Sequence, residues 1–272
     1  MSAARIKNLI LLILALAVCF LLAAVAPGRL AAQRTAAAVE EQLTELFARY
    51  GVTLEAELPR SEALCTVELA DNSESAAQAL LGQDAQADAD STRYETRFSS
   101  AYGTAVFRRS GTVEAELKVP ARGSYEKDMK RRLRAMGCIV WQMQPAVRED
   151  DGSYRLTARQ SLQGMPVFGA EVTFIYRDGM LSAVSGTLCP GGTAQRVSEQ
   201  ECMSCADALT QILASRDETG WVGSRILSMQ QGYLHAETAA AALRFVPMWR
   251  IETDTALFFV NGITGEVRQS EA

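Results

Sequence analysis

The chain has 272 residues, of which 48% are hydrophobic and 22% are charged, a balance typical of a globular protein with a core and not of a disordered chain. The net charge of −5 argues against a nucleic-acid-binding protein, because the sequence offers no basic footprint for phosphates. A single histidine, His235, leaves little room for metal or acid–base chemistry.

An uncharged apolar run extends from Asn8 to Ala26 and, at about 1.5 Å per residue, nearly spans a hydrocarbon core of roughly 30 Å. A cleaved signal peptide is one interpretation, but Pro27 disfavours cleavage after the small residues that precede it. A lipoprotein site at Cys19 is another, and the bulky Val18 argues against it. The third interpretation, an uncleaved anchor, is the one that we favour.

These features predict a cytoplasmic tail at residues 1–7 and a transmembrane anchor at residues 8–27. Basic residues lie on both sides of the run, so charge gives the orientation only weakly. We expect a single-pass protein of the cell membrane with its N-terminus inside and its body outside the cytoplasm. Residues 29–50 are rich in Ala, Glu, Gln and Leu and predict a helical stalk after the anchor.

The rest of the chain alternates between strand and helix patterns. Strands are predicted over residues 52–58, 63–69, 94–99, 103–108, 112–119, 154–162, 166–177, 180–187, 226–235, 243–253 and 255–260, with a short closing strand at 266–268. Helices are predicted over residues 73–81, 124–136 and 198–215, the last with a capping box of Ser198 and Glu201. Asp178 and Gly179 are typical of a hairpin turn.

These elements predict an α+β fold. It would consist of the transmembrane helix and stalk, then antiparallel sheets with helices packed on one face, in two similar subdomains: residues 28–120, which include the stalk, and residues 121–272. The division follows Pro120 to Gly123, a plausible joint. A faint repeat, a tyrosine-led strand followed by a Val-Phe pair, occurs at residues 94–107 and 154–168.

Two clusters could carry chemistry, and each has a structural explanation that we prefer. Cys202 and Cys205 have the spacing of a redox pair near a helix start, but they share an apolar stripe with the residues that follow, which indicates buried thiols. The basic residues of 130–134 lie opposite an apolar face and indicate a solvated helix surface. We therefore predict no enzyme, no catalytic, cofactor or metal residues, and no cofactor. The five cysteines of the body are an odd set, unlike a disulfide framework, and the sequence does not assign their states: Cys65, Cys138, Cys189, Cys202 and Cys205.

The second half resembles PepSY-type and thermolysin-propeptide-type modules. The resemblance rests on a hairpin and on two closing strands with a Thr-Gly-Glu turn, carried by Gln160, Gly164, Pro166, Val167, Phe168, Gly169, Val172, Asp178, Gly179, Val184, Gly186, residues 247–251 and residues 259–267. It implies a helix-on-sheet module with an inhibitory or regulatory role and no catalytic residues.

The whole-chain layout is similar to the YycI and YycH regulatory proteins of Gram-positive bacteria. The layout comprises a short tail at residues 5–9, an anchor, a stalk, a strand ending in Glu57-Leu58-Pro59 and a strand-rich body. The resemblance implies a regulator that binds and modulates a membrane sensor histidine kinase of a two-component system, with a second, related regulator as a further candidate partner. The partners expected are therefore this kinase and the membrane, with no nucleic acid and no small-molecule substrate. The alternative is a propeptide-like inhibitor or chaperone of a secreted protease, with the hairpin of residues 166–187 as strand donor.

Overall fold

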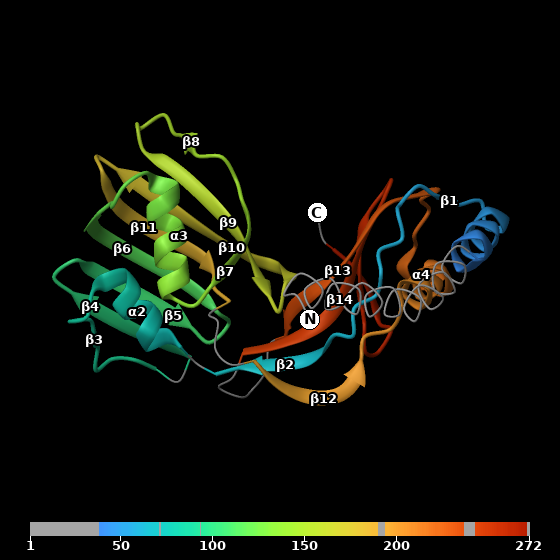
Figure 1. Cartoon of the computed structure of the whole chain (residues 1–272), viewed down its shortest axis with the longest axis horizontal. Coiled ribbons are helices and arrows are strands. Elements are labelled where there is room, and N and C mark those ends of the chain that lie inside the picture. The colour runs from blue at the N-terminus through green and yellow to red at the C-terminus, as the bar shows by residue number, and fades with distance from the viewer. Residues whose placement is uncertain (1–37, 71, 93, 190–193, 237–242, 271–272) are drawn as a thin grey trace, which may run out of the picture.

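The computed structural model describes residues 38–70, 72–92, 94–189, 194–236 and 243–270 (Figure 1). In these residues, sixteen strands form one mixed sheet with the order β12-β2-β14-β13-β10-β11-β6-β5-β4-β3, to which the other strands attach at the sides. The predicted fold class is wrong, since strands outweigh helices and build one large mixed sheet in place of a stalk followed by two similar subdomains.

The membrane prediction also needs correction. In the described ranges, no helix is long and apolar enough to cross a membrane, which contradicts the expectation of a single-pass transmembrane protein. The predicted anchor at residues 8–27 and the tail before it lie outside the described residues.

One half of the molecule, the α2–α3 lobe, is a sheet with two helices on one face (Figure 1). Alternation of apolar and polar residues gives each central strand one buried and one open face, most regularly in β6, where Val113, Ala115 and Leu117 are buried and Glu114, Glu116 and Lys118 are exposed. The lobe contains β3 (Gln86–Ala87), β4 (Glu95–Ser100), β5 (Gly103–Arg108), β6 (Thr112–Pro120), β7 (Ile139–Met143), β8 (Val147–Arg148), β9 (Tyr154–Leu162), the second part of β10 (Met165–Arg177), β11 (Met180–Thr187), α2 (Ser73–Leu81) and α3 (Tyr125–Ala135).

A buried ion pair ties α3 to the sheet. The Asp128 carboxylate accepts hydrogen bonds from Arg132 Nε at 2.7 Å and from the Tyr176 hydroxyl of β10 at 3.1 Å, and Arg131 also contacts it. Asp128 is fully buried and Arg132 is 6% exposed. The basic residues of this helix are therefore not a uniform solvated face, because Arg132 turns inward to a carboxylate one turn earlier.

The other half, the α4 lobe, is a sheet whose helices lie on the side away from the α2–α3 lobe (Figure 1). Tryptophan, leucine and phenylalanine side chains fill its core, with Trp249 and Phe47 fully buried. The lobe contains β1 (Thr53–Leu54), β2 (Cys65–Leu69), the first part of β10, β12 (Gln195–Glu201), β13 (Arg225–Ala236), β14 (Leu243–Thr253), β15 (Leu257–Asn261), β16 (Val267–Gln269), α4 (Cys205–Ala214), α5 (Arg216–Thr219) and the helix 38–49.

Two helix predictions change in this lobe. The described part of the predicted stalk, the helix 38–49, packs Leu43 and Phe47 into the core and so belongs to the body. The helix predicted from residue 198 begins only at Cys205, where Ser204 and Asp207 form the capping box. The residues before it form β12, which pairs with β2, so the earlier box of Ser198 and Glu201 goes unused.

The long strand β10 joins the lobes. Val167 and Phe168 pair in parallel with β13, whereas Glu171 to Tyr176 pair antiparallel with β9. Between them Gly169 has a φ of 77°, which favours glycine and lets the strand bend. The strands from both sides of residue 120 share the α2–α3 sheet, since β6 pairs with β11.

A buried glutamine supports this bend. The side-chain amide of Gln160 donates to the carbonyl oxygens of Ala170 and Thr187 at 3.2 and 2.7 Å, and its oxygen accepts from the backbone N–H of Cys189 at 2.8 Å. A bend takes backbone N–H and C=O groups out of the hydrogen bonds between strands. Because the Gln160 side chain provides partners for such groups here, few buried polar atoms are left unpaired.

Candidate functional site

Strand β7 forms an edge of the α2–α3 lobe. It pairs with β9 on one side, and no described strand pairs with its other side. Ile139 is 59% exposed, Trp141 45%, and Val147 of the neighbouring β8 55%. Residues 138–147 carry no charged side chain. Charged side chains are one of the devices that protect exposed sheet edges, and β7 has none, so this edge suggests a surface that pairs with another chain.

A β-bulge sets the direction of the tryptophan. Val140 lies opposite Gln160 and Gln142 lies opposite Arg159, which leaves Trp141 as the extra residue. Val140 packs against the lobe's core. Trp141 and Gln142 instead line a hollow on the open side of the sheet. The bulge thus aims a large aromatic side chain at the junction of the lobes.

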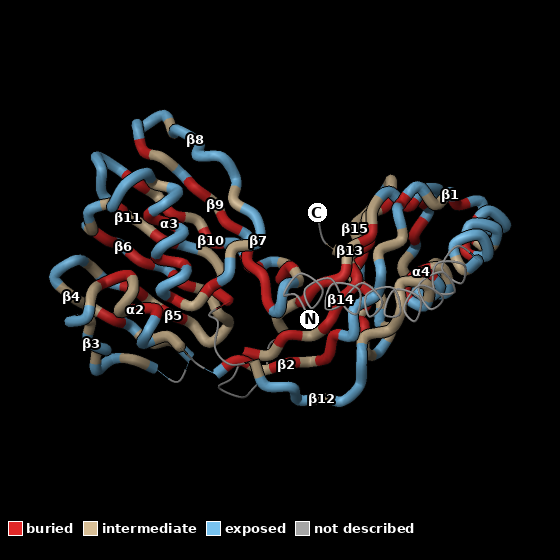
Figure 2. Tube along the Cα trace, viewed as in Figure 1, coloured by how far each residue is buried: buried red, intermediate tan, exposed pale blue. Residues whose placement is uncertain are grey.

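This hollow, the junction cleft, has a volume of about 310 Å³ and is lined by both lobes. Figure 2 shows the exposed edge of β7 beside the place where β10 crosses to β13. The wall of the junction cleft consists of aromatic and aliphatic side chains and a few charged ones. The lining residues are Trp141, Gln142, Arg159, Pro166, Val167, Phe168, Gly169, Glu171, Gln230, Arg250, Leu257 and Phe259.

Phe168 is held in place within the cleft. Its ring centroid lies 5.5 Å from that of Phe259 on β15. The ring also packs over Gly232 of β13, where a Cβ atom would come within 2.7 Å of it. Only glycine leaves room for this packing, so the sequence reserves space for the ring and fixes one wall of the cleft.

The charges of the cleft are largely paired across strands. Arg159 Nε contacts Glu171 at 2.6 Å, and both side chains are about half exposed. Arg250 lies in a cross-strand row with Gln230 and Phe259, and its ion pair with a glutamate of the same strand is longer, at 3.5 Å. The cleft therefore offers aromatic surface and one weakly paired guanidinium, which suits a peptide segment better than a reacting group.

The residues considered for chemistry in the sequence do not meet here. Cys202 precedes α4 and Cys205 begins it, both in the α4 lobe. Burial raises the pKa of both thiols, the opposite of what a redox-active cysteine needs. His235 lies on β13 with its ring 5.6 Å from that of Phe245. Among the described residues, no three His, Cys, Asp or Glu side chains gather in a way that could hold a metal ion.

Sequence reasoning passed over the residues of β7. The sequence does contain a strand signal here: the apolar run Ile139-Val140-Trp141 lies between Gly137 and Pro145. The run is short and lacks alternation, because the bulge interrupts the period of two. By contrast, the predicted hairpin of residues 166–187 contributes Pro166 to Gly169 and Glu171 to the cleft.

Comparisons with known proteins give little further guidance. No family model matches the chain, and no curated protein matches it. Two solved structures are similar: an uncharacterized protein from Eubacterium rectale ATCC 33656, at 11% identity and a TM-score of 0.49 over 81% of this chain and 90% of that one, and the Bacillus megaterium YpeB C-terminal domain, at 12% identity and a TM-score of 0.34 over 75% and 99%. At these TM-scores neither likeness carries an argument about family. Membership of the YycI or YycH family is not shown.

Proposed function

We propose that this chain is a non-catalytic regulatory protein that acts outside the cytoplasm by binding a second protein. The binding surface is the edge of β7 together with the junction cleft. A segment of the partner lies in extended form along β7, and an apolar side chain of that segment packs against Trp141 and Phe168. The N-terminal apolar sequence carries the body across the membrane.

The observation that supports this proposal most is the exposed, uncharged edge at β7. A strand added there would gain backbone hydrogen bonds along its length, as in other cases of β-strand addition. An exposed tryptophan beside a preformed aromatic wall is the kind of anchor that dominates binding energy at protein interfaces. Ile139 and Trp141 supply such an anchor within one strand.

The partner that we propose is a membrane sensor histidine kinase, which the resemblance to YycI and YycH suggests. Binding would bias the kinase between two states by making better contacts with one of them. The proposal for the partner rests on the sequence resemblance, whereas the proposal for the surface rests on β7.

A secreted protease is the second candidate partner. The resemblance to thermolysin-propeptide modules suggests it, and an added strand is the contact such a partner would make. The hairpin of residues 166–187 cannot donate its strands in this fold, since β10 lies between β9 and β11 and β11 lies between β10 and β6. An inhibitor of this kind would have to use β7.

Site-specific photo-cross-linking in the native host tests the function. A photo-reactive phenylalanine analogue is placed at Trp141 or, as a control, at Val222, an exposed apolar residue of the α4 lobe that is 82% exposed and lies outside the cleft. We expect one discrete adduct from position 141, identified by mass spectrometry as a membrane sensor kinase, and none from position 222. A secreted protease in the adduct would replace the first candidate with the second. No adduct from position 141, or the same adducts from both positions, would contradict protein binding through β7.

A further inference from the structure

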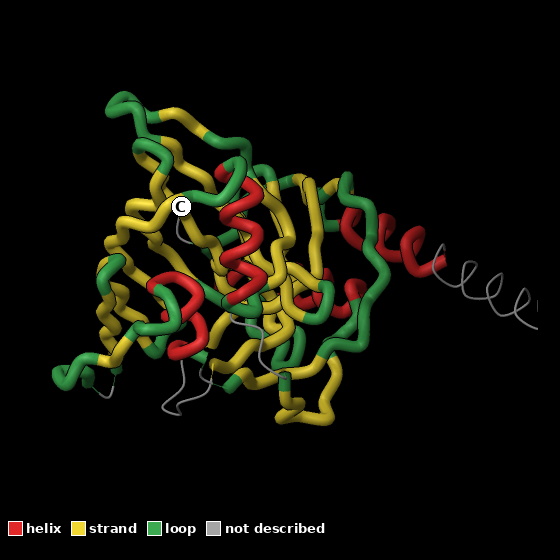
Figure 3. Tube along the Cα trace, turned by 60° about the vertical axis from the view of Figure 1, so that its left-hand side comes forward, coloured by secondary structure: helices red, strands yellow, loops and turns green. Residues whose placement is uncertain are grey.

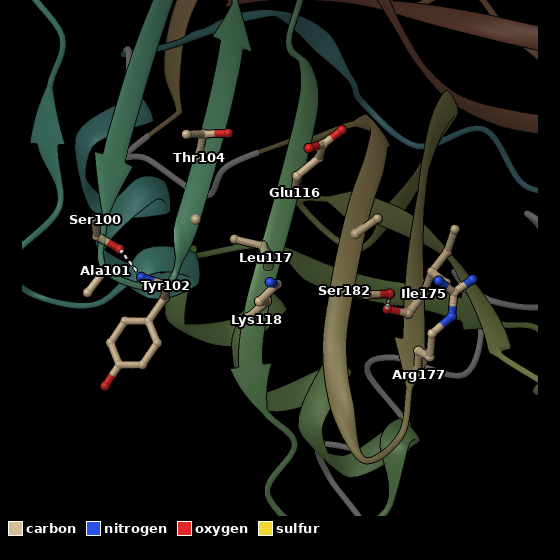
Figure 4. A pocket seen from close by; sticks show the side chains of 12 residues that line it. Ser100, Ala101, Tyr102, Thr104, Glu116, Leu117, Lys118, Ile175, Arg177 and Ser182 are labelled. Atoms are coloured by element: carbon tan, nitrogen blue, oxygen red, sulfur yellow. Dashed lines mark hydrogen bonds between the residues drawn. The ribbon is translucent and has the colours of Figure 1, made fainter.

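A second hollow lies on the open face of the α2–α3 lobe, away from α2 and α3 (Figure 4). Its volume is about 740 Å³, within the roughly 300–1,000 Å³ typical of small-molecule sites. Tyr102 and Lys118 stand on one side of it, and Ile175 and Arg177 on the other. It is separate from the junction cleft: along β10, Ile175 in the hollow and Glu171 in the cleft are about 13 Å apart at the rise of an extended strand.

Small residues and a bulge at Ser182 form the floor of this hollow. Gly103 is essential to the floor, because a Cβ atom there would overlap the carbonyl oxygen of Glu116 on the next strand. Ser182 and Ala183 lie beside it on β11. The register of β11 against β6 shifts at these positions, and such bulges bend a sheet locally. The hollow is thus built into the sheet itself.

In the part of the chain that the structure describes, several polar groups around the hollow are unpaired. Other charges of this lobe form ion pairs, as in Arg108 with Glu114 at 2.9 Å and Arg155 with Glu149 at 3.1 Å. In the hollow, Arg177 pairs with Asp151. Within the described ranges, however, the side chains of Lys118, Glu116 and Tyr102 have no hydrogen bond or ion pair, so unused donors and acceptors lie around the hollow.

Hydrogen bonds hold the backbone of the turn that carries Tyr102 on the aromatic side of the hollow. The backbone N–H of Tyr102 donates to Ser100 Oγ at 3.0 Å, and its carbonyl oxygen accepts from the N–H of Lys118 at 2.8 Å. Ser100 Oγ in turn donates to the carbonyl oxygen of Leu81 at the end of α2. The Tyr102 ring, which is 44% exposed, therefore projects from a backbone segment that is already ordered before a ligand binds.

These features fit one class of ligand. A sugar hydroxyl group both donates and accepts hydrogen bonds, so a sugar can bind a carboxylate and cationic side chains at the same time. The C–H face of a sugar ring also packs on an aromatic ring. An anion would meet Glu116, and a cation would meet Lys118 and Arg177. We propose that this hollow binds a short neutral oligosaccharide. The site is independent of the partner proposed for β7.

Titration of the purified full chain with three neutral trisaccharides tests this site. The probes are maltotriose, cellotriose and N,N′,N″-triacetylchitotriose, with trigalacturonic acid and trialanine as competing classes; calorimetry gives the affinity and saturation-transfer NMR gives the bound face. We expect one neutral trisaccharide to bind, and Glu116→Gln or Tyr102→Ala to weaken it by about tenfold or more. Lys130→Ala, at an exposed position of α3 outside the hollow, should leave binding unchanged.

Several outcomes would overturn the proposal. The first is that no neutral trisaccharide binds. The second is that the Glu116→Gln and Tyr102→Ala variants bind the trisaccharide as tightly as the parent chain does. The third is a preference for trigalacturonic acid or trialanine. Glu116→Gln keeps the size of an exposed side chain and so should fold as the parent does. A loss seen in both variants therefore reports on the hollow and not on unfolding. Cross-linking from position 141 is unaffected by any of these results.

Discussion

The rings of Phe168 on β10 and Phe259 on β15 lie 5.5 Å apart with a tilt of 55°, and this contact fixes the first part of the strand that connects the lobes to the α4 lobe, in the wall of the junction cleft. Phe168 also packs over Gly232, so two strands of the α4 lobe, β13 and β15, position one ring of the strand that connects the lobes. Figure 3 shows that strands make up most of the molecule and that helices pack against them. The cleft is therefore formed by ordinary core packing that continues to the surface.

Gly232→Ala should destabilise the chain by overpacking. A Cβ atom at this position would lie 2.5 Å from the carbonyl oxygen of Pro166 and 2.7 Å from the Phe168 ring, and such crowding typically costs about 1–3 kcal/mol. The midpoint of urea unfolding should fall, with Leu227→Ala on the same strand as a milder control. An unchanged midpoint for Gly232→Ala would show that the ring does not need this space.

Ile139→Lys should slow aggregation of the purified chain. The side chain is 59% exposed on an uncharged edge, and lysine on an edge strand discourages pairing with further chains. Light scattering against protein concentration measures the effect, and Val222→Lys adds the same charge at an exposed site away from the edge. Equal protection by both substitutions would mean that net charge, not the edge, controls association.

Asp128→Asn should lower the free energy of unfolding at neutral pH by about 3–5 kcal/mol, because it leaves the buried Arg132 without its counter-charge. Burial on its own raises the pKa of the Asp128 carboxyl, but the hydrogen bonds from Arg132 and the N–H of Arg122 outweigh burial and hold it below its usual value. The ionised carboxylate therefore adds stability above its unfolded pKa of about 3.9, and this stability is lost as the pH falls through the lower folded value.

Urea unfolding at pH 7 and near pH 3 separates the two contributions. The difference between the parent chain and Asp128→Asn should be largest at pH 7 and should shrink in acid, whereas Glu126→Gln, at an exposed position of the same helix, should change little. A difference that stays constant with pH would show that the carboxylate is not ionised in the folded chain.

Native thiol reactivity should divide the body cysteines into two groups. Burial raises the pKa of Cys189 to about 12 and raises that of Cys138 further, so at pH 8 their thiolate fractions fall roughly three orders of magnitude or more below that of a free thiol. Cys205 is half-buried, and burial raises its pKa less strongly. Labelling with a chromogenic disulfide should reach Cys205 first and the other two only in urea. Rapid labelling of Cys202 and Cys205, faster than a free thiol, would restore the redox interpretation.

Most of the strand pattern could be predicted from sequence, and the sheet that it forms could not. The sequence pattern predicts the strands of residues 103–108 and 243–253 with the bounds that the structure shows. Ser124 caps its helix as the sequence indicates. The pairing of β10 with β13 depends on a bend at Gly169 and on packing over Gly232, contacts between residues far apart in the chain. No local pattern contains such information.

The candidate site shows the same limit. Gln160, Phe168 and Gly169 were noted as parts of a hairpin, but their role at the junction follows from the second sheet. Trp141 was missed because its bulge breaks the alternation that marks a strand. The capping box of Ser204 and Asp207 competed with that of Ser198 and Glu201, and pairing of β12 with β2 decided between them.

Amide hydrogen exchange of β7 tests the central claim most directly, with the partner identified by cross-linking added to the purified chain. In the free chain, amides of residues 139–143 that face away from β9 should exchange rapidly, and the partner should slow their exchange while leaving β3, the edge on the far side of the same sheet, unchanged. Trp141→Ala should abolish this protection. Protection that appears at β3 or elsewhere, with β7 still exchanging at its free rate, would contradict the account.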